Sequence, residues 1–385
     1  MSNRQRALAV LGYRPYDRLP LVHFGFWGGI TLQQWAAEGH VTVAEAESWA
    51  DGNFTDDAIA ARLGFDFNWQ CMFSPATRVW PAFASEVAAE FADGTRHVRN
   101  GNGVVVVEKP DAGSIPAEID HVLKDRPSWE AHYKHRYRWS KERVQQAEVR
   151  TREGFVRFDR GGLEFLRQDR RGFPYGLHCG SLYGQIRDVL GLENACYLAV
   201  DDPPLFDEIV ETVGELCYES VKCALVGGAH FDFGHFWEDI CFKNGPLIAP
   251  SAFAEKIGPH YRRITDLLRE YGIDIVSVDC DGDIDTLVPI WFENGVNTMF
   301  PIEVGTWRAS IAPWRDRYGP QLRGVGGVDK NVLSRDHAAV DAEIERIRPL
   351  VELGGYLPCL DHRIAPDAEW DLVRYYCDRM RAVFG

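Results

Sequence analysis

Short apolar segments recur along this chain, and a helical segment separates most neighbouring pairs of them. Apolar runs of this length that end in glycine or polar residues are typical of buried parallel strands. The strand candidates are residues 21–27, 65–71, 155–158, 172–180, 230–237, 273–279, 298–303, 322–329 and 354–362. About eight strands that alternate with helices predict an α/β fold, a single (β/α)8 TIM barrel. A doubly wound sheet is the alternative, but the chain has no Gly-x-Gly-x-x-Gly motif and no Gly-Lys-Ser/Thr phosphate loop.

Residues 82–110 have a different pattern from the rest of the chain. The dipeptides Asp93-Gly94 and Asn100-Gly101, which are typical of β-hairpin turns, separate its apolar runs. The segment is too small to hold a core of its own, so we expect an antiparallel β insertion and not a separate domain. Residues 1–385 are therefore expected to form one barrel domain that includes the insertion.

The charge and cysteine content of the chain limit the classes of partner and the cellular compartment that we expect. The formal net charge is −15 and no basic stripe offsets the acids, so neither nucleic acid nor an anionic membrane is expected as a partner. The nine cysteines are scattered without a Cys-x-x-Cys pair, which is typical of reduced thiols. No apolar run predicts a signal peptide or a membrane span, so we expect a cytoplasmic protein.

The segment 273–283 carries the strongest sign of a functional site. Its apolar residues lead into three acids, Asp279, Asp281 and Asp283, where the strand ends before a helix. Side chains alternate faces along a strand, so Asp279 and Asp281 are expected on one face and Cys280 on the other. Asp281 and Asp283 could equally serve the turn or cap the next helix. Asp279 lies within the apolar run, where a buried carboxylate needs a partner or a metal.

Other polar residues also follow the predicted strands, and in a barrel all these strand ends surround one mouth. Asp279, Asp281 and His362 could supply converging donors for a metal, completed by Glu303 or Glu238. Asp281 and His362 are 81 positions apart, about three strand-helix units, so the last loop would have to lean across the mouth. His362 could instead be an ordinary loop histidine, and Glu238 could cap or turn the chain.

Aromatic and imidazole side chains at the same strand ends predict a pocket wall. The predicted substrate-binding residues are His23, Trp27, His178, Tyr183, His235 and Trp237. His178 and His235 stand in aromatic segments, so burial in the core is at least as good an interpretation for these two.

Five segments, 3–8, 18–22, 243–250, 326–330 and 354–367, together resemble the uroporphyrinogen decarboxylase superfamily. The resemblance covers nearly the whole chain, and it implies a (β/α)8 barrel and a homodimer. It also implies one of two activities. The first is decarboxylation of uroporphyrinogen without a cofactor, and the second is zinc-dependent methyl transfer between a corrinoid protein and a thiol or methylated substrate.

Departures from the motifs of this family favour the second activity. The decarboxylases carry an arginine-rich motif after their first strand, whereas residues 24–29 here are apolar and would leave the carboxylates of a porphyrinogen unpaired. In the methyltransferases, a His-x-Cys pair after the fifth strand and a Cys before the final helix hold zinc. The matching positions are Asp279, Asp281 and His362, and His362 also matches a substrate-facing histidine of the decarboxylases. Oxygen and nitrogen donors admit divalent ions other than zinc.

These observations lead to three hypotheses. The first is a metal-assisted methyltransferase or demethylase, which passes a methyl group from a small methoxylated or methylated compound to a corrinoid protein, with Glu238 as general acid. The second is a cofactor-free decarboxylase or lyase of a small carboxylated substrate, which Arg187 or Arg363 would clamp. The third is a binding protein on an enzyme fold. Under the first hypothesis the metal ligands are Asp279, Asp281, Glu303 and His362, and the catalytic residues are Glu238, Asp279 and His362.

Overall fold

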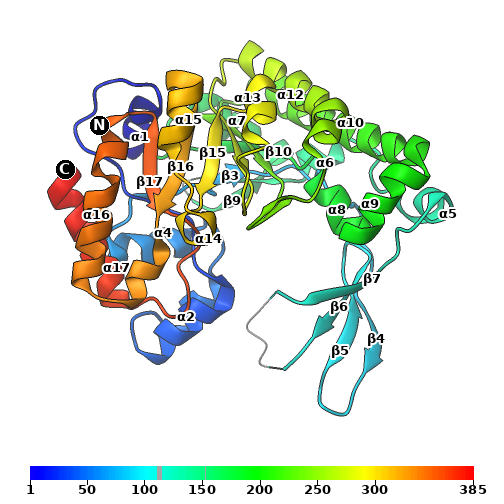
Figure 1. Cartoon of the computed structure of the whole chain (residues 1–385), viewed down its shortest axis with the longest axis horizontal. Helices are drawn as coiled ribbons and strands as arrows, with labels where there is room; N and C mark the ends of the chain where they lie inside the picture. The colour runs from blue at the N-terminus through cyan, green and yellow to red at the C-terminus, as the bar shows by residue number, and fades with distance from the viewer. Residues whose placement is uncertain (111–114, 152) are drawn as a thin grey trace.

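The computed structural model describes residues 1–110, 115–151 and 153–385, and its centre is a curled parallel sheet (Figure 1). The sheet has nine strands in the order β2-β1-β17-β16-β15-β14-β11-β10-β3. Their bounds are β1 Val22–His23, β2 Phe67–Asn68, β3 Met72–Phe73, β10 Gly176–Gly180, β11 Phe233–Trp237, β14 Val276–Asp279, β15 Thr298–Ile302, β16 Arg323–Val328 and β17 Tyr356–Leu360. β15 and β17 are buried at every position, as expected for parallel strands that are covered on both faces.

The two edge strands of this sheet come from one stretch of chain. β2 pairs with β1, β3 pairs with β10, and only residues 69–71 separate β2 from β3. The chain turns there, because Asn68 accepts hydrogen bonds from Cys71 N–H through its carbonyl and from Gln70 N–H through its side chain. The sheet therefore curls until its edges are consecutive in sequence, which is consistent with a TIM-barrel-like α/β fold. No ladder joins β2 to β3 among the described residues, so the closed barrel that we predicted is an open one.

Helices cover the outer side of the sheet (Figure 1). In α10 (Pro203–Val226) the buried residues recur with helical spacing, as at Leu205, Ile209, Val213 and Leu216, so one apolar stripe faces the sheet. The remaining α-helices of the described residues are α1 Asn3–Leu11, α2 Gly28–Ala37, α3 Val43–Ser48, α4 Phe54–Leu63, α5 Arg126–Ser128, α6 Glu142–Gln145, α7 Gly162–Gln168, α8 Gly184–Leu190, α9 Leu192–Asp201, α11 Pro250–Ala252, α12 Gly258–Glu270, α13 Val288–Glu293, α14 Val304–Trp307, α15 Ile311–Tyr318, α16 His337–Glu352 and α17 Trp370–Phe384.

The predicted insertion is a four-stranded antiparallel sheet, β4-β5-β6-β7, that projects from the barrel (Figure 1). Its strands are β4 Glu86–Glu90, β5 Arg96–Arg99, β6 Val104–Glu108 and β7 Ala117–His121. The sequence pattern placed the end of the insertion at residue 110, but β7 pairs with β6 and extends it to His121. β7 is mostly exposed, and its apolar residues Ala117 and Ile119 alternate with Glu118 and Asp120, but the sequence interpretation ended the insertion before this short strand.

Residues 155–158, a barrel-strand candidate from the sequence pattern, lie outside the central sheet. β9 (Phe155–Arg157) pairs instead with β8 (Glu148–Arg150) as an antiparallel hairpin. An apolar run indicates that a segment can pair, but not which neighbour it will pair with. A second short antiparallel pair joins β12 (Cys241–Phe242) to β13 (Gly245–Pro246) after β11.

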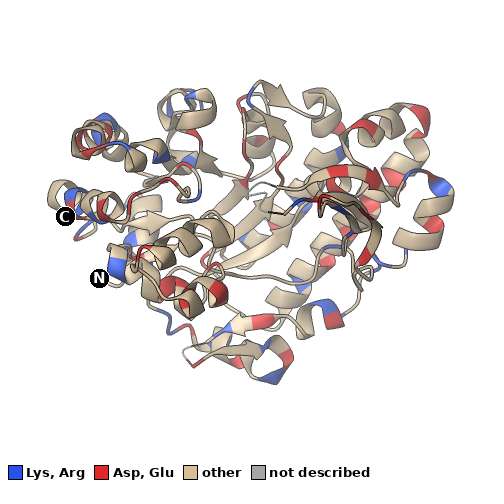
Figure 2. Ribbon diagram, turned by 90° about the horizontal axis from the view of Figure 1, so that it is seen from below, with Lys and Arg blue, Asp and Glu red and all other residues tan. Residues whose placement is uncertain are grey.

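Charged residues are spread over the whole molecule (Figure 2). Lys and Arg positions stand among Asp and Glu positions, and this view shows no continuous basic face of the kind that binds polyanions. In the described part of the chain, no helix has both the length and the apolar character that crossing a membrane requires.

Candidate active site

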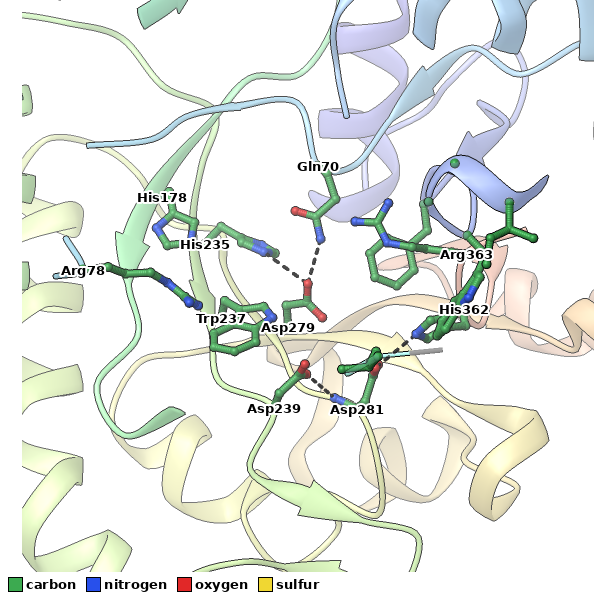
Figure 3. Close-up of a pocket in the computed structure, with 16 residues that line it drawn as sticks. Gln70, Arg78, His178, His235, Trp237, Asp239, Asp279, Asp281, His362 and Arg363 are labelled. Carbon is green, nitrogen blue, oxygen red and sulfur yellow. Dashed lines mark hydrogen bonds and ion pairs between the residues drawn. The ribbon is translucent and has the colours of Figure 1, made fainter. Parts of the chain in front are cut away.

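A pocket with a volume of about 640 Å³ lies at the carboxyl-terminal ends of the parallel strands (Figure 3). Active sites of (β/α)8 barrels are found at this end. The pocket is lined by Phe24, Trp27, Gly28, Gly29, Ile30, Gln70, Arg78, Ile115, His178, His235, Trp237, Asp239, Asp279, Asp281, His362 and Arg363. Aromatic and aliphatic side chains therefore surround a group of carboxylates and imidazoles.

Three carboxylates meet in this pocket. Asp279 ends β14, Asp281 follows shortly after it, and Asp239 follows the neighbouring strand β11 in a left-handed backbone conformation with φ 49°. One oxygen atom of each carboxylate lies within 4.8 Å of the others. The N–H of Asp281 donates to Asp239 Oδ1 at 3.2 Å, and Gln70 Nε2 donates to Asp279 Oδ2 at 2.7 Å. The ends of two adjacent strands thus hold three acids in one place.

Burial and mutual repulsion make this cluster difficult to ionise fully. Burial raises the pKa of Asp279 well above its ordinary value, and the charges of Asp239 and Asp281 raise it further. Burial also raises the pKa of Asp239 to about 7, with a further contribution from Asp281. A cluster that keeps protons near neutral pH can transfer a proton, or can bind a cation that replaces the protons.

His362 reaches the cluster from across the barrel mouth. It follows β17, which is three strands from β14 in the sheet order, and yet its Nε2 lies 3.1 Å from Asp281 Oδ2. Its ring packs against Phe24 and Trp27, with centroid distances of 5.5 and 5.2 Å. The loop after β17 therefore leans across the mouth, as the predicted convergence of Asp281 and His362 required. The structure brings Asp279, Asp281 and His362 together in the pocket.

Two further imidazoles lie beside the cluster, on β10 and β11 (Figure 3). Burial lowers the pKa of His178 to about 4, with a further contribution from Arg78, and burial lowers the pKa of His235 well below its ordinary value. Both rings are therefore neutral at pH 7. His178 Nδ1 accepts a hydrogen bond from Gly180 N–H at 3.0 Å, so the proton of this ring is on Nε2. His235 Nδ1 is hydrogen-bonded to Ser277 Oγ at 2.7 Å.

The predicted substrate-binding residues divide into two groups. Trp27, His178, His235 and Trp237 line the pocket, whereas His23 and Tyr183 do not. His23 is 1% exposed, accepts a hydrogen bond from Gly25 N–H, and lies 3.8 Å from Asp56. Tyr183 is buried and packs near Phe206 of α10. Both side chains belong to the core, so the predicted contact of His23 and Tyr183 with a substrate finds no support in this pocket.

Glu238 does not face the pocket either, which corrects its interpretation as a general acid. Its fully buried carboxylate accepts hydrogen bonds from the backbone N–H groups of residues 182–184 and from the hydroxyls of Ser181 and Tyr261. These N–H groups precede or begin α8, where they have no partner within the helix. A side chain at Gly184 would collide with the carbonyl of Glu238, so this close approach requires glycine. Glu238 therefore has a structural role.

Glu303, the fourth predicted metal ligand, lies next to the cluster but does not line the pocket. Its Oε2 accepts a hydrogen bond from Gly282 N–H at 2.5 Å, and its Oε1 accepts one from Thr306 Oγ1 at 2.9 Å. Glu303 thus holds the backbone directly after Asp281. Among the described residues, the cluster of carboxylates that could hold a metal consists of Asp239, Asp279 and Asp281. Asp239, and not Glu303, is therefore its third member.

Asp239 is a strand-end residue of the pocket that the sequence interpretation did not select as a metal ligand or catalytic residue. His235, Trp237 and Asp239 alternate along β11 and its extension, and all three line the pocket, which leaves Glu238 on the other side. The alternation that pointed to Asp279 was therefore also the signal for Asp239.

No protein-family model matches this chain, and no curated protein matches its sequence. Among solved structures, a methyltransferase from Methanosarcina mazei superposes with a TM-score of 0.61 at 13% identity, over 100% of this chain and 99% of the other. A Listeria monocytogenes protein described as a vitamin-B12-independent methionine synthase gives a TM-score of 0.35 at 14% identity, over 62% of this chain and 72% of the other, which is too low to support an argument. At 13% identity, the first similarity shows a shared fold.

The donor atoms of the cluster fit a divalent cation. Carboxylate oxygens are suitable ligands for magnesium, manganese or zinc. His362, a predicted ligand, lies outside this group of carboxylates and contacts Asp281 Oδ2 through Nε2 instead. Asp281 Oδ1 is buried without a hydrogen-bond partner among the described residues, which leaves it available to such an ion. No cysteine is among the described residues that line the pocket, and Cys280 is buried between Asp279 and Asp281. The site thus lacks the sulfur ligands that favour zinc, and zinc is one candidate among several.

Proposed function

We propose that this protein is a metal-assisted methyltransferase or demethylase, which takes a methyl group from a small methoxylated or methylated compound and passes it to a corrinoid partner protein. The observation that carries the proposal is the meeting of Asp239, Asp279 and Asp281 with His362 in one pocket. The full-length similarity in fold to a methyltransferase supports it.

Each residue of the cluster would have a distinct task. Asp239, Asp279 and Asp281 would hold the cation through one oxygen each. The cation would supply Lewis-acid stabilisation of the negative charge that develops on the substrate oxygen as the methyl group leaves. His362 would donate from Nε2 to Asp281 Oδ2 and keep that carboxylate in place, as Gln70 does for Asp279.

The apolar part of the pocket suits a small organic substrate. Phe24 and Trp27 pack against His362. His362 lies on one side of the carboxylates and Trp237 on the other (Figure 3). These side chains would keep water away from the reacting methyl group, which strengthens electrostatic interactions in the site. A volume of about 640 Å³ lies in the range of small-molecule pockets. A corrinoid is much larger, so the partner protein would have to dock over the barrel mouth.

Metal content tests the proposal. Protein purified without chelator or affinity metal is analysed by elemental mass spectrometry, together with an Asp281→Ala, His362→Ala double variant. We expect near-stoichiometric divalent metal in the wild type and none in the double variant. Methyl transfer from a methoxylated compound to a reduced corrinoid should occur only with the wild type. Asp274→Asn removes an exposed carboxylate just before β14 and should keep the metal, whereas full activity of the double variant would refute the proposal.

A cofactor-free decarboxylase or lyase is the alternative, because Arg78 and Arg363 line the same pocket. Arg363 is already held by Asp51 through hydrogen bonds of 3.0 and 2.7 Å. Arg187 pairs with Asp188 and does not line the pocket. Release of carbon dioxide from a substrate by metal-free protein would favour this alternative.

A further inference from the structure

Arg78 is a cation in the pocket that the proposed metal site does not use. Its guanidinium stacks on the ring of Trp237, with Cζ 4.3 Å from the ring centroid. Its side chain is 40% exposed, and its described ion pair uses Nη1, which lies 3.3 Å from Asp188 Oδ2. A guanidinium has five N–H donors in a planar fork, so donors remain for a ligand.

The backbone that carries Arg78 is held in place by a buried arginine. Arg143 is 1% exposed and donates to the carbonyl groups of Ala76, Arg78 and Trp80, at 2.6, 2.9 and 3.3 Å. These bonds fix the path of the segment before any ligand arrives. The position of Arg78 is therefore preorganised, which lowers the entropy cost of binding.

Two neutral imidazoles lie near Arg78 in the pocket (Figure 3). The proton of His178 is on Nε2, because its Nδ1 accepts a hydrogen bond from Gly180. His235 is 1% exposed, and its Nε2, which carries the ring proton when Ser277 Oγ donates to Nδ1, has no hydrogen-bond partner among the described residues. Asp279 Oδ2 lies 3.9 Å from this nitrogen, which is too far for a hydrogen bond. A buried polar atom of this kind needs a partner, which a bound ligand can supply.

We propose that Arg78, His178 and His235 form a carboxylate-binding subsite, and that the substrate of this pocket is a small organic acid. This inference rests on the proposed function, because it names the substrate class of the same pocket. One guanidinium fork matches the geometry of one carboxylate. Asp239 and Asp279 repel the negative charge of the substrate's acid group. The acid group therefore lies toward Arg78, and the methyl-bearing group lies toward the carboxylate cluster.

Titration with benzoate and benzamide tests the subsite, because these two probes have nearly the same shape and differ in charge. Isothermal titration calorimetry is carried out on the wild type, Arg78→Gln and Arg78→Lys, and the metal content of each sample is measured. We expect the wild type to bind benzoate at least about tenfold more tightly than benzamide. Arg78→Gln should lose about tenfold to a hundredfold in benzoate affinity. Arg78→Lys should retain part of it, because lysine keeps the charge but not the fork.

Arg348→Gln is the matched control, because Arg348 is 42% exposed, pairs with Glu345 on α16 and lies outside the pocket. It should keep the wild-type preference for benzoate. Equal binding of the two probes, no binding of either, or an unchanged preference in Arg78→Gln would overturn the inference. The outcome of this titration is independent of the metal-content and methyl-transfer assays that test the proposed function. Benzoate selectivity without metal would leave the subsite standing and remove the proposed function, and metal with methyl transfer but no selectivity would do the reverse.

Discussion

Replacement of Asp279 by asparagine should stabilise the metal-free protein. The facing oxygens of Asp239, Asp279 and Asp281 are at most 4.8 Å apart. At that separation two unit charges repel by about 3 kcal/mol for an effective dielectric constant of about 20. Protons relieve part of this repulsion, because the pKa of Asp279 lies well above its ordinary value. At pH 8 we therefore expect Asp279→Asn to raise the free energy of unfolding by about 1–3 kcal/mol.

The same substitution should remove the stabilisation that metal provides. A cation at about 100 times its dissociation constant stabilises the folded state by about 2.7 kcal/mol. An unfolding entropy of about 2.1 cal/mol/K per residue means that 1 kcal/mol shifts the Tm of a 385-residue chain by about 1 °C. Metal should thus raise the Tm of the wild type by about 3 °C. Asp279→Asn should start about 1–3 °C higher without metal and gain nothing from it.

Thermal unfolding of chelated and metal-loaded samples measures both effects. Asparagine keeps an acceptor oxygen for Gln70, so the substitution changes the charge with little change in shape. Asp274→Asn is the control, because it makes the same charge change at an exposed position just before β14. Its Tm should follow the wild type in both conditions. A metal-free Asp279→Asn protein that is less stable than the wild type, or one that metal still stabilises, would refute the reasoning.

Two further predictions concern Asp239 and Glu238. Because the pKa of Asp239 rises from 3.8 to about 7 on folding, the folded metal-free protein binds more protons in this range, and its stability falls as the pH rises through it. Urea unfolding should show a loss of up to about 4 kcal/mol between pH 4 and pH 8, which Asp239→Asn reduces and Asp274→Asn does not. Glu238→Gln should lower the free energy of unfolding by about 2–4 kcal/mol but keep the metal, because its amide N–H groups would face backbone donors. Loss of metal at unchanged stability would contradict the structural role of Glu238.

The parallel sheet could be predicted because its cause is local. Buried runs such as Thr298–Ile302 and amphipathic helices such as α10 show their periods directly in the sequence. Pairing is different, because it depends on contacts between distant or irregular segments. The turn at residues 69–71, which separates β2 from β3, depends on hydrogen bonds to Asn68. The apolar pattern of the sequence does not indicate that β9 pairs with β8.

The residues of the candidate site also fall into those that a local sequence pattern predicts and those that depend on distant contacts. Asp279 and Asp281 could be predicted as neighbours on one face because strand alternation is a local rule, and both line the pocket. Arg78 lies in irregular chain, where neither the strand period nor the helix period applies. The position of Arg78 depends on Arg143, which is 65 residues away in the sequence. No pattern within a short window could have shown that contact.

The meeting of Asp281 with His362 depends on a third strand end that lies between them. Glu303, directly after β15, accepts a hydrogen bond from Gly282, which follows Asp281. Asp361, directly before His362, accepts hydrogen bonds from the N–H groups of residues 304 and 305, at 2.9 and 2.7 Å. The loop after β15 thus ties the loops after β14 and β17 to itself through carboxylates outside the pocket. Nε2 of His362 and Oδ2 of Asp281 are therefore held 3.1 Å apart by backbone contacts, so that the protein itself can preorganise this side of the site before a cation binds.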